Sequence, residues 1–342
     1  MKKIFFSIMA VAALAACTKS EVQYEGTEQI GFAPVAENLT KSVAGVAANG
    51  AYDATFPTDL NLYVFANAQA DDLSTTWPDP YFANASFIYG RIADNGVYEG
   101  SPARYWPNVK SLIFAGYSNA CNIDEIAENS TVSFDAVNKT STIVIEGYVQ
   151  DNTETDAGVN DLMWFPWDTK SYTKQKTAVA AQMKHACSWI TVKVMRDAQT
   201  TDETWKLDGL KINGLYHTGT ATCGTTAATW DVSGATAAET LFSKTGTTLT
   251  TAAVAYEDNA NNMVVIPQTP TSIDVTYSYV PQEGVDPIQE TVPNLSLKYN
   301  GDAKWESGKH YVYTITITAT EILVAPTVEE WTPVTVTPGV SI

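Results

Sequence analysis

The chain has 342 residues, 45% of them hydrophobic, so it is long enough for two domains that each bury a core. It carries 20 Lys and Arg against 38 Asp and Glu, a formal net charge of −18. A strongly acidic surface repels nucleic acid and anionic membranes, so the composition argues against both as binding partners.

The first residues resemble the signal of a bacterial lipoprotein. Lys2 and Lys3 precede an apolar stretch, Ile4–Leu14, that is too short to span a bilayer as a helix. Leu-Ala-Ala then precedes Cys17, which matches the lipobox of such signals. We expect residues 1–16 to be removed as a signal peptide and Cys17 to carry lipid. A plain secretory signal with an incidental cysteine is the alternative.

The first half of the chain is predicted to consist of short β-strands. The candidate segments are rich in β-branched and aromatic residues, and Gly, Asn, Asp and Pro separate them. The first is Ile30–Phe32, and a basic residue, Lys41, follows it before Ser42 and a run of small residues. The later segments are 60–65, 87–89, 112–117, 132–134 and 143–145.

Three stretches near the middle of the chain are predicted to lie outside regular strands. Residues 165–177 are polar, carry three lysines and are interpreted as a linker between two β domains. Residues 218–253 are rich in Thr, Ala and Gly, for which we expect little regular order. Short helical turns are predicted at 123–128 and 239–242.

The second half alternates clearly between apolar and polar residues at 190–194, 273–279 and 311–318. In the last of these, Tyr311, Tyr313, Ile315 and Ile317 share one face and Thr residues share the other. A period of two places one face in a core and the other in water, as in antiparallel sandwiches. The sequence therefore predicts an all-β protein.

The chain ends on an apolar strand pattern, at residues 332–342. Val334, Val336, Val340 and Ile342 fall on one parity and would share one face of an extended strand. Most termini are polar and fray, so this face is expected to be buried. Two interpretations remain: the last strand of the chain's own sandwich, or a strand that completes the sheet of a neighbouring subunit.

Motifs for catalysis or metal binding are not found. The three histidines lack the spacing of metal ligands, and no nucleophile elbow or phosphate-binding glycine loop occurs, so we expect no enzyme activity, metal site or cofactor. Cys121, Cys187 and Cys223 are interpreted as small buried hydrophobes, although one disulfide remains open. Of the nine tryptophans, a core position is expected for Trp106, Trp189, Trp305 and Trp331, whereas Trp77, Trp164 and Trp167 remain undecided.

Several short motifs occur in a fixed order between Cys17 and the C-terminus. They are Ile30-Gly31-Phe32 with Thr40-Lys41-Ser42, Tyr105-Trp106-Pro107 with Leu112–Tyr117, Asp161-Leu162-Met163 with Met183–Ser188, Trp305–Tyr313, and Glu330-Trp331. In this order they resemble the motifs of bacterial fimbrillins. The chain departs from that pattern at Gly116, where an aromatic residue or alanine is usual, at Met183, where Phe is usual, and at Lys41, where Arg is commoner.

The resemblance implies two transthyretin-like antiparallel β-sandwich domains of Greek-key topology. A propeptide with a removable first strand, including Ile30 and Phe32, would span residues 17–41. The N-terminal domain would span 42–170, and the C-terminal domain, with its donor strand, 171–342.

The resemblance also implies a function as a structural pilin. The lipidated precursor would reach the outer membrane, a trypsin-like protease would cut between Lys41 and Ser42, and the C-terminal strand of another subunit would fill the groove left by the first strand. The partners would be other pilin subunits, the protease and outer-membrane lipid, and the product an extracellular fimbria that supports adhesion. A monomeric cell-surface glycan-binding lipoprotein is the alternative, and an unrecognised enzyme is a third.

Overall fold

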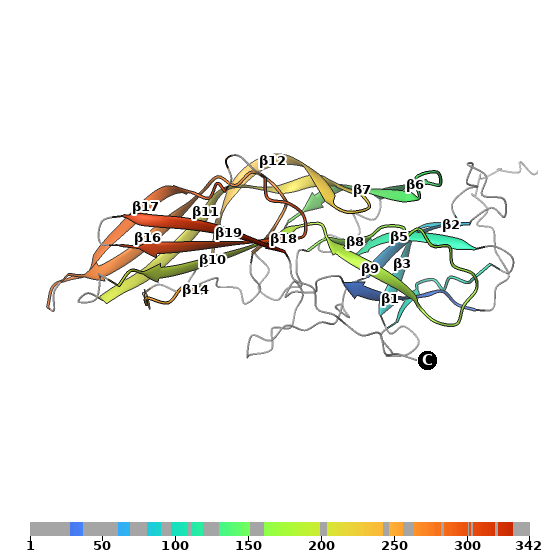
Figure 1. Ribbon diagram of the computed structural model, residues 1–342, viewed down its shortest axis with the longest axis horizontal. Coiled ribbons are helices and arrows are strands. Elements are labelled where there is room, and N and C mark those ends of the chain that lie inside the picture. Colours follow the sequence, from blue (N-terminus) through green and yellow to red (C-terminus); the bar gives the residue numbers. More distant parts are fainter. Residues whose placement is uncertain are drawn as a thin grey trace, which may run out of the picture.

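The fold is given by a computed structural model, and the description covers part of the chain. The described residues are 28–36, 61–68, 81–89, 97–107, 111–118, 130–150, 161–198, 204–241, 246–255, 263–281, 284–299, 301, 304–318 and 321–330. Within them every regular element is a β-strand, so the all-β expectation is confirmed. Figure 1 shows an elongated molecule with the early strands at one end and β16 and β17 at the other.

The early strands form a closed barrel in the order β1-β4-β3-β2-β5-β8-β9. A core of apolar residues, most of them fully buried, fills it and includes Phe32, Phe87 and Phe114. The bounds of the barrel strands are β1 Gly31–Ala36, β2 Leu62–Ala68, β3 Phe82–Tyr89, β4 Tyr98–Gly100, β5 Leu112–Ser118, β8 Met163–Phe165 and β9 Val179–His185.

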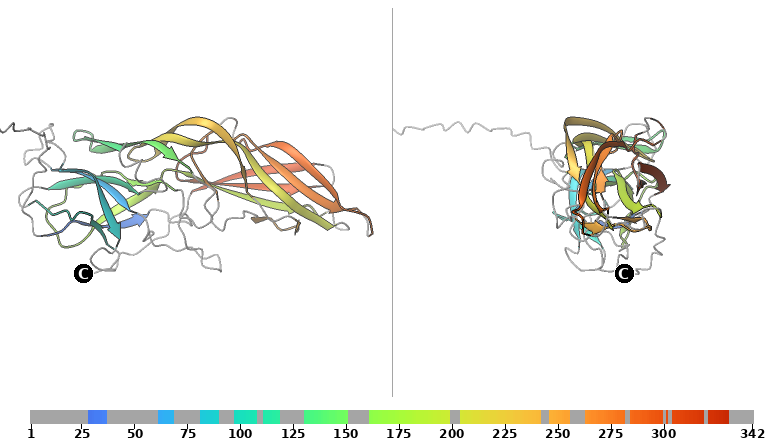
Figure 2. Two further views of the ribbon diagram at one scale, coloured as in Figure 1. Left: turned by 180° about the vertical axis from the view of Figure 1, so that it is seen from behind. Right: turned by 90° about the vertical axis from the view of Figure 1, so that its left-hand side faces the viewer.

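Two further sheets make up the rest of the fold (Figure 2). One has the order β14-β10-β18-β19, with β15 paired to β10, and the other has the order β17-β16-β11-β7-β6, with β12 and β13 paired to β11. The strands of the first sheet are β10 Ser188–Arg196, β14 Val254–Ala255, β15 Met263–Val265, β18 Lys309–Ile317 and β19 Ile322–Glu330. Those of the second are β6 Ser130–Asp135, β7 Thr140–Val149, β11 Thr204–Cys223, β12 Ala228–Thr240, β13 Thr247–Thr248, β16 Ser272–Val280 and β17 Ile288–Ser296.

The alternating patterns of the sequence account for the core between these two sheets. The apolar parity of β18 is buried, as are the inward residues of β10, β11 and β16, and they form one cluster around Trp305. A separate cluster joins the barrel to the sheets: Tyr63 and Tyr117 on the outside of the barrel share it with Ile143 and Tyr148 of β7. Because both of their faces are covered, β2 and β5 are buried almost throughout.

The expected linker is a loop that connects two strands of the barrel. Residues 166–178 join β8 to β9, these two strands pair with each other, and Tyr172 pairs with Leu112. The expected boundary at residues 170 and 171 therefore falls within the barrel, and the chain leaves the barrel after His185. The polar composition of this segment misled the prediction, because a loop at the end of a barrel and a linker between domains are both exposed to solvent.

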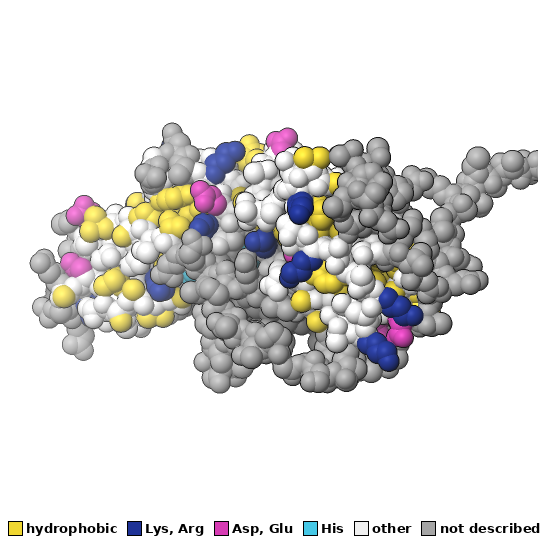
Figure 3. Space-filling model, turned by 45° about the vertical axis from the view of Figure 1, so that its right-hand side comes forward, with side chains coloured by type: hydrophobic (Ala, Val, Ile, Leu, Met, Phe, Trp, Pro, Cys, Tyr) yellow, Lys and Arg dark blue, Asp and Glu magenta, His cyan; other side chains and the backbone are white. Residues whose placement is uncertain are grey.

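Two other expectations require correction. Residues 218–241 belong largely to β11 and β12, which form a long hairpin, because Thr favours strands and a hairpin needs no bulky side chain on its exposed face. Glu239 and Thr240 end β12 and do not form a helical turn. The run of small residues that begins at Ser42 and the segment 123–128 lie outside the described residues. On the face in Figure 3, Asp and Glu side chains are dispersed among polar and hydrophobic groups.

Candidate functional site: the closing strand of the barrel

Strand β1 closes the barrel by lying between β4 and β9, which are not paired with each other. On one side it pairs with β4 in antiparallel register, Gly31 opposite Glu99 and Phe32 opposite Tyr98. On the other side it pairs with β9 in parallel register, from Phe32 opposite Val179 to Ala36 opposite Met183. The two partners therefore hold different ends of β1 and meet it together at Phe32.

Residues just before β1 contact the segment that follows β4. The amide of Ile30 donates to the carbonyl of Arg104 at 2.7 Å, and the amide of Trp106 donates to the carbonyl of Glu28 at 2.9 Å. The register with β4 ends at Phe32, two residues before Pro34. A proline lacks an N–H, and this position on the β4 side has no ladder bond to lose.

The side chains of β1 alternate in burial as a barrel strand requires. Phe32 and, just before the strand, Ile30 are fully buried, while Gly31 and Ala33 are partly exposed. The ring of Phe32 packs edge-on against Phe87 and Phe114, with centroids 4.8 Å and 5.1 Å apart, and lies 5.9 Å from that of Phe165. These partners come from β3, β5 and β8, so Phe32 sits in the middle of the barrel core.

Gly31 allows β1 to approach the segment before β4 closely. A Cβ atom at this position would lie 2.7 Å from a methyl carbon of Val97, which is closer than two carbon atoms can approach. The strand is therefore fitted to this site by a small residue on one face and by a large ring on the other. Loss of β1 would leave β4 and β9 with unpaired edges and would open the pockets of Ile30 and Phe32 to water.

The predicted donor strand, residues 332–342, follows β19 in the sequence. Strand β19 pairs with β18 along its whole length, from Ile317 opposite Ile322 to Lys309 opposite Glu330. It lies at the end of its sheet's strand order and carries Pro326, a residue tolerated at sheet edges because it cannot donate to a neighbour. The described chain ends with Glu330.

The structure describes two of the predicted site residues, Ile30 and Phe32, and places both in the barrel core. The others, Cys17, Lys41, Ser42, Val334, Val336, Val340 and Ile342, lie outside the described residues.

The remaining candidate side chains are integrated into the cores. Cys187 and Cys223 are buried, whereas Cys121 lies outside the described residues. Trp106, Trp189 and Trp305 are buried as expected, and so are Trp164 and Trp167, whose positions were undecided. Trp77 and Trp331 fall outside the described part.

Sequence reasoning missed a buried polar pair near the end of β9. The Nδ1 atom of His185 contacts a carboxylate oxygen of Asp161, and both side chains are almost fully buried. Asp161 belongs to the motif Asp161-Leu162-Met163 and His185 to the motif Met183–Ser188. Neither motif alone indicates that the two side chains are in contact. Among the described residues there is no group of three or more His, Cys, Asp or Glu that could hold a metal ion. Within the same residues no helix is long and apolar enough to cross a membrane.

The chain is similar to known proteins in sequence and in fold. The chain's residues 50–331 match the model of a family described as fimbrillin-like. A fimbrial protein from Bacteroides vulgatus has a similar structure, with a TM-score of 0.60 and 17% identity, over 89% of this chain and 99% of that one. The tip fimbrial protein Mfa3 from Porphyromonas gingivalis, with a C-terminal truncation, matches at a TM-score of 0.41 and 8% identity over 89% and 99%. The comparison with curated proteins gave no match. Since the family model covers most of its length, the chain belongs to the fimbrillin-like family, a family of fimbrial structural proteins and not of enzymes.

Proposed function

We propose that this protein is a pilin subunit of a surface fimbria, which is exported as a lipoprotein, matured by a trypsin-like protease and polymerised by donor-strand exchange. The observation that carries the proposal is the position of β1. It is the strand that joins β4 to β9, and Phe32 of this strand and Ile30 just before it belong to the barrel core. A strand in this position can be replaced by another strand without rearranging the other six.

Maturation would act on both ends of the propeptide. Lipid on Cys17 would hold the precursor at the outer membrane, where more than one acyl chain is needed for stable attachment. A cut between Lys41 and Ser42 would separate β1 covalently from the remainder of the barrel. The strand would then be held only by its ladder and its buried side chains. The alternative for Lys41 is that it is an ordinary loop lysine.

Exchange would replace one set of buried side chains by another. Val334, Val336, Val340 and Ile342 of a second subunit would each contribute about 1.5–3 kcal/mol on burial, before the cost of ordering the tail. New ladder bonds to the open edges would add to this. Donor and acceptor are different surfaces, so the contact is heterologous and propagates as a filament. The growing filament would extend from the cell surface as a fimbria and support adhesion.

The proposed organisation retains two transthyretin-like sandwich domains. In it the barrel and the β6–β7 end of the second sheet would form the first, and the remaining strands of the two large sheets the second. The alternative function, a monomeric glycan-binding lipoprotein of the cell surface, draws support from a half-buried tryptophan, Trp230, at the wall of a pocket.

Truncation of the tail tests the proposal. Deletion of residues 335–342 from the mature protein should leave the melting temperature of the monomer nearly unchanged and abolish the SDS-resistant ladder of polymers. Val336→Asp and Val340→Asp should behave alike, because an uncompensated charge in an apolar pocket is costly. Thr335→Asp and Ser341→Asp, on the opposite face, are the matched controls and should still polymerise. A large fall in melting temperature on truncation would assign the tail to the monomer's own core instead.

A further inference from the structure

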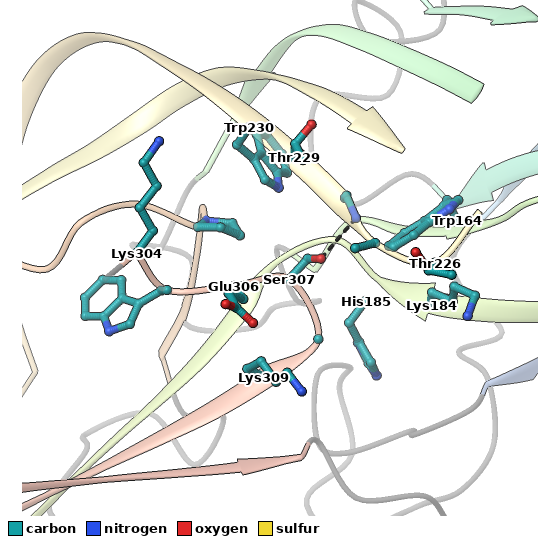
Figure 4. A pocket seen from close by; sticks show the side chains of 15 residues that line it. Trp164, Lys184, His185, Thr226, Thr229, Trp230, Lys304, Glu306, Ser307 and Lys309 are labelled. Atoms are coloured by element: carbon teal, nitrogen blue, oxygen red, sulfur yellow. Dashed lines mark hydrogen bonds between the residues drawn. The ribbon is translucent and has the colours of Figure 1, made fainter. Parts of the chain in front are cut away.

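A pocket of about 750 Å³ lies where the end of the barrel meets the two large sheets (Figure 4). Four parts of the chain form its walls: β8 with the end of β9, the turn between β11 and β12 with the start of β12, Pro267 after β15, and the segment from Lys304 to Lys309 that leads into β18. Its volume is in the range of small-molecule sites. Of these walls only the end of β9, at Lys184 and His185, adjoins the groove that β1 fills, since β1 pairs with β9 as far as Met183.

The charge of the pocket is opposite to that of the protein. Lys184, Lys304 and Lys309 line it, and Glu306 is the one acidic residue among the lining residues. The whole chain has a net charge of −18. Figure 4 shows Lys184 and Lys304 at opposite sides of the pocket and Lys309 on a third side. Separated positive charges around a cavity favour an extended anionic ligand over a compact ion.

Trp230 provides an aromatic wall. Its indole Nε1 donates to the carbonyl of Ala186 at 2.7 Å, and its ring packs edge-on against Tyr148 with centroids 5.1 Å apart. These contacts fix the orientation of the ring and use its only hydrogen-bond donor. The half-buried indole is therefore available to a ligand through its apolar surface, which suits the flat C–H face of a pyranose ring.

Short hydroxyl side chains line the pocket between the lysines. Thr226 and Thr229 are exposed on the turn between β11 and β12 and at the start of β12. The hydroxyl of Ser307 accepts a hydrogen bond from the amide of Ala228 at 3.0 Å, so it keeps its own proton to donate (Figure 4). Hydroxyls of this kind both donate and accept, which matches the mixed hydrogen bonding of sugar hydroxyls.

We propose that this pocket binds an anionic oligosaccharide. The lysines would attract the acidic groups, the ring of Trp230 would stack on a sugar ring, and the threonine and serine hydroxyls would bond to its hydroxyls. The site goes beyond the proposed assembly function: it is complete within one subunit, and its test uses unassembled monomer. A failure of the subunits to polymerise would not count against this binding site.

The test measures binding of three probes to the mature monomer by titration calorimetry. The first is an oligomer of galacturonic acid, the second is its methyl ester, which keeps the sugar and removes the charge, and the third is an oligomer of glutamic acid, which keeps the charge and removes the sugar. We expect binding of the galacturonic acid oligomer alone. Its affinity should fall between about 0.05 M and about 0.5 M NaCl as the charges are screened.

Two variants examine the site by different means. The triple variant Lys184→Gln, Lys304→Gln and Lys309→Gln should weaken binding about tenfold, from three partly screened charges. Ala227→Trp places a bulky side chain at an exposed position of the pocket wall without a change of charge, and it should abolish binding. Lys211→Gln removes an exposed lysine of β11 outside the pocket and is the matched control, with unchanged affinity expected.

Each other result overturns the proposal. No binding of the galacturonic acid oligomer at millimolar concentration would dismiss the site. Equal binding of the glutamic acid oligomer would show attraction by charge alone, and equal binding of the methyl ester would show that the lysines have no role. If Lys211→Gln lost as much affinity as the triple variant, the oligomer would be binding to the general surface of the protein and not to the pocket. Melting curves of all variants establish that they are folded, and either pocket variant is sufficient should the other fail to fold.

Discussion

Replacement of Phe32 by alanine should destabilise the precursor by about 3–5 kcal/mol, because the site cannot collapse around the missing ring. The ring is fully buried, and burial of a Phe side chain contributes about 1.5–3 kcal/mol. Its edge-on contacts with Phe87 and Phe114 add about 0.5–1.5 kcal/mol each. Removal of the ring takes atoms from the centre of a closed barrel whose seven strands restrict relaxation.

Urea denaturation of the precursor without its lipid measures this loss. Phe32→Leu should cost less than about 1.5 kcal/mol, since it keeps an apolar side chain of similar size. Ala33→Ser, on the partly exposed face of the same strand, should change the free energy of unfolding by less than about 0.5 kcal/mol. A loss below about 1 kcal/mol for Phe32→Ala would refute the reasoning, since β1 would then contribute little to the barrel and its removal would open no groove.

Three further predictions concern processing and pH. Lys41→Ala should leave the precursor lipidated and folded but unassembled, and normal filaments from this variant would contradict cleavage at that residue. Mass spectrometry of the membrane-bound precursor should find acyl mass on Cys17, and a start at any other residue would exclude that assignment. Burial against Trp189, together with repulsion from Lys193, lowers the pKa of His310 from 6.5 to about 4. The unfolded chain then takes up a proton at a higher pH than the folded one, so stability should fall as the pH drops from about 6.5 to about 4. His310→Phe keeps a ring on Trp189 and should flatten this part of the profile, and identical profiles for both proteins would rule the effect out.

The strongly alternating strands could be predicted from sequence almost to the residue. The segments expected at 273–279 and 311–318 are observed as Ser272–Val280 and Lys309–Ile317. Period-two alternation predicts a strand with one buried face and one more accessible face. In both segments the apolar parity is buried and the other residues are mostly of intermediate exposure. Strands without that contrast were missed, such as β12, whose residues are mostly exposed, and the three-residue β4.

Pairing partners could not be predicted. Alternation shows which side chains of β1 face inward, but not that the strand lies between β4 and β9 or that it runs parallel to β9. That arrangement depends on contacts between residues about 150 positions apart in the sequence, which local patterns cannot predict. The pocket was missed for the same reason, since Lys184, Trp230 and Lys304 come from distant segments that only the fold brings together.

The length of β11 has a mechanical consequence. Its 20 residues would reach about 65 Å when extended. One part pairs with β16, and another pairs with β7 of the hairpin beside the barrel. Between these two parts β11 is held by β12, and that pairing has register shifts between Ile212 and Leu215 and between Tyr216 and Thr218. Bending of the subunit is therefore expected at these bulges, where few ladder pairs would have to break. Because β11 continues through them, a nick between β8 and β9 would not divide the subunit into independent halves.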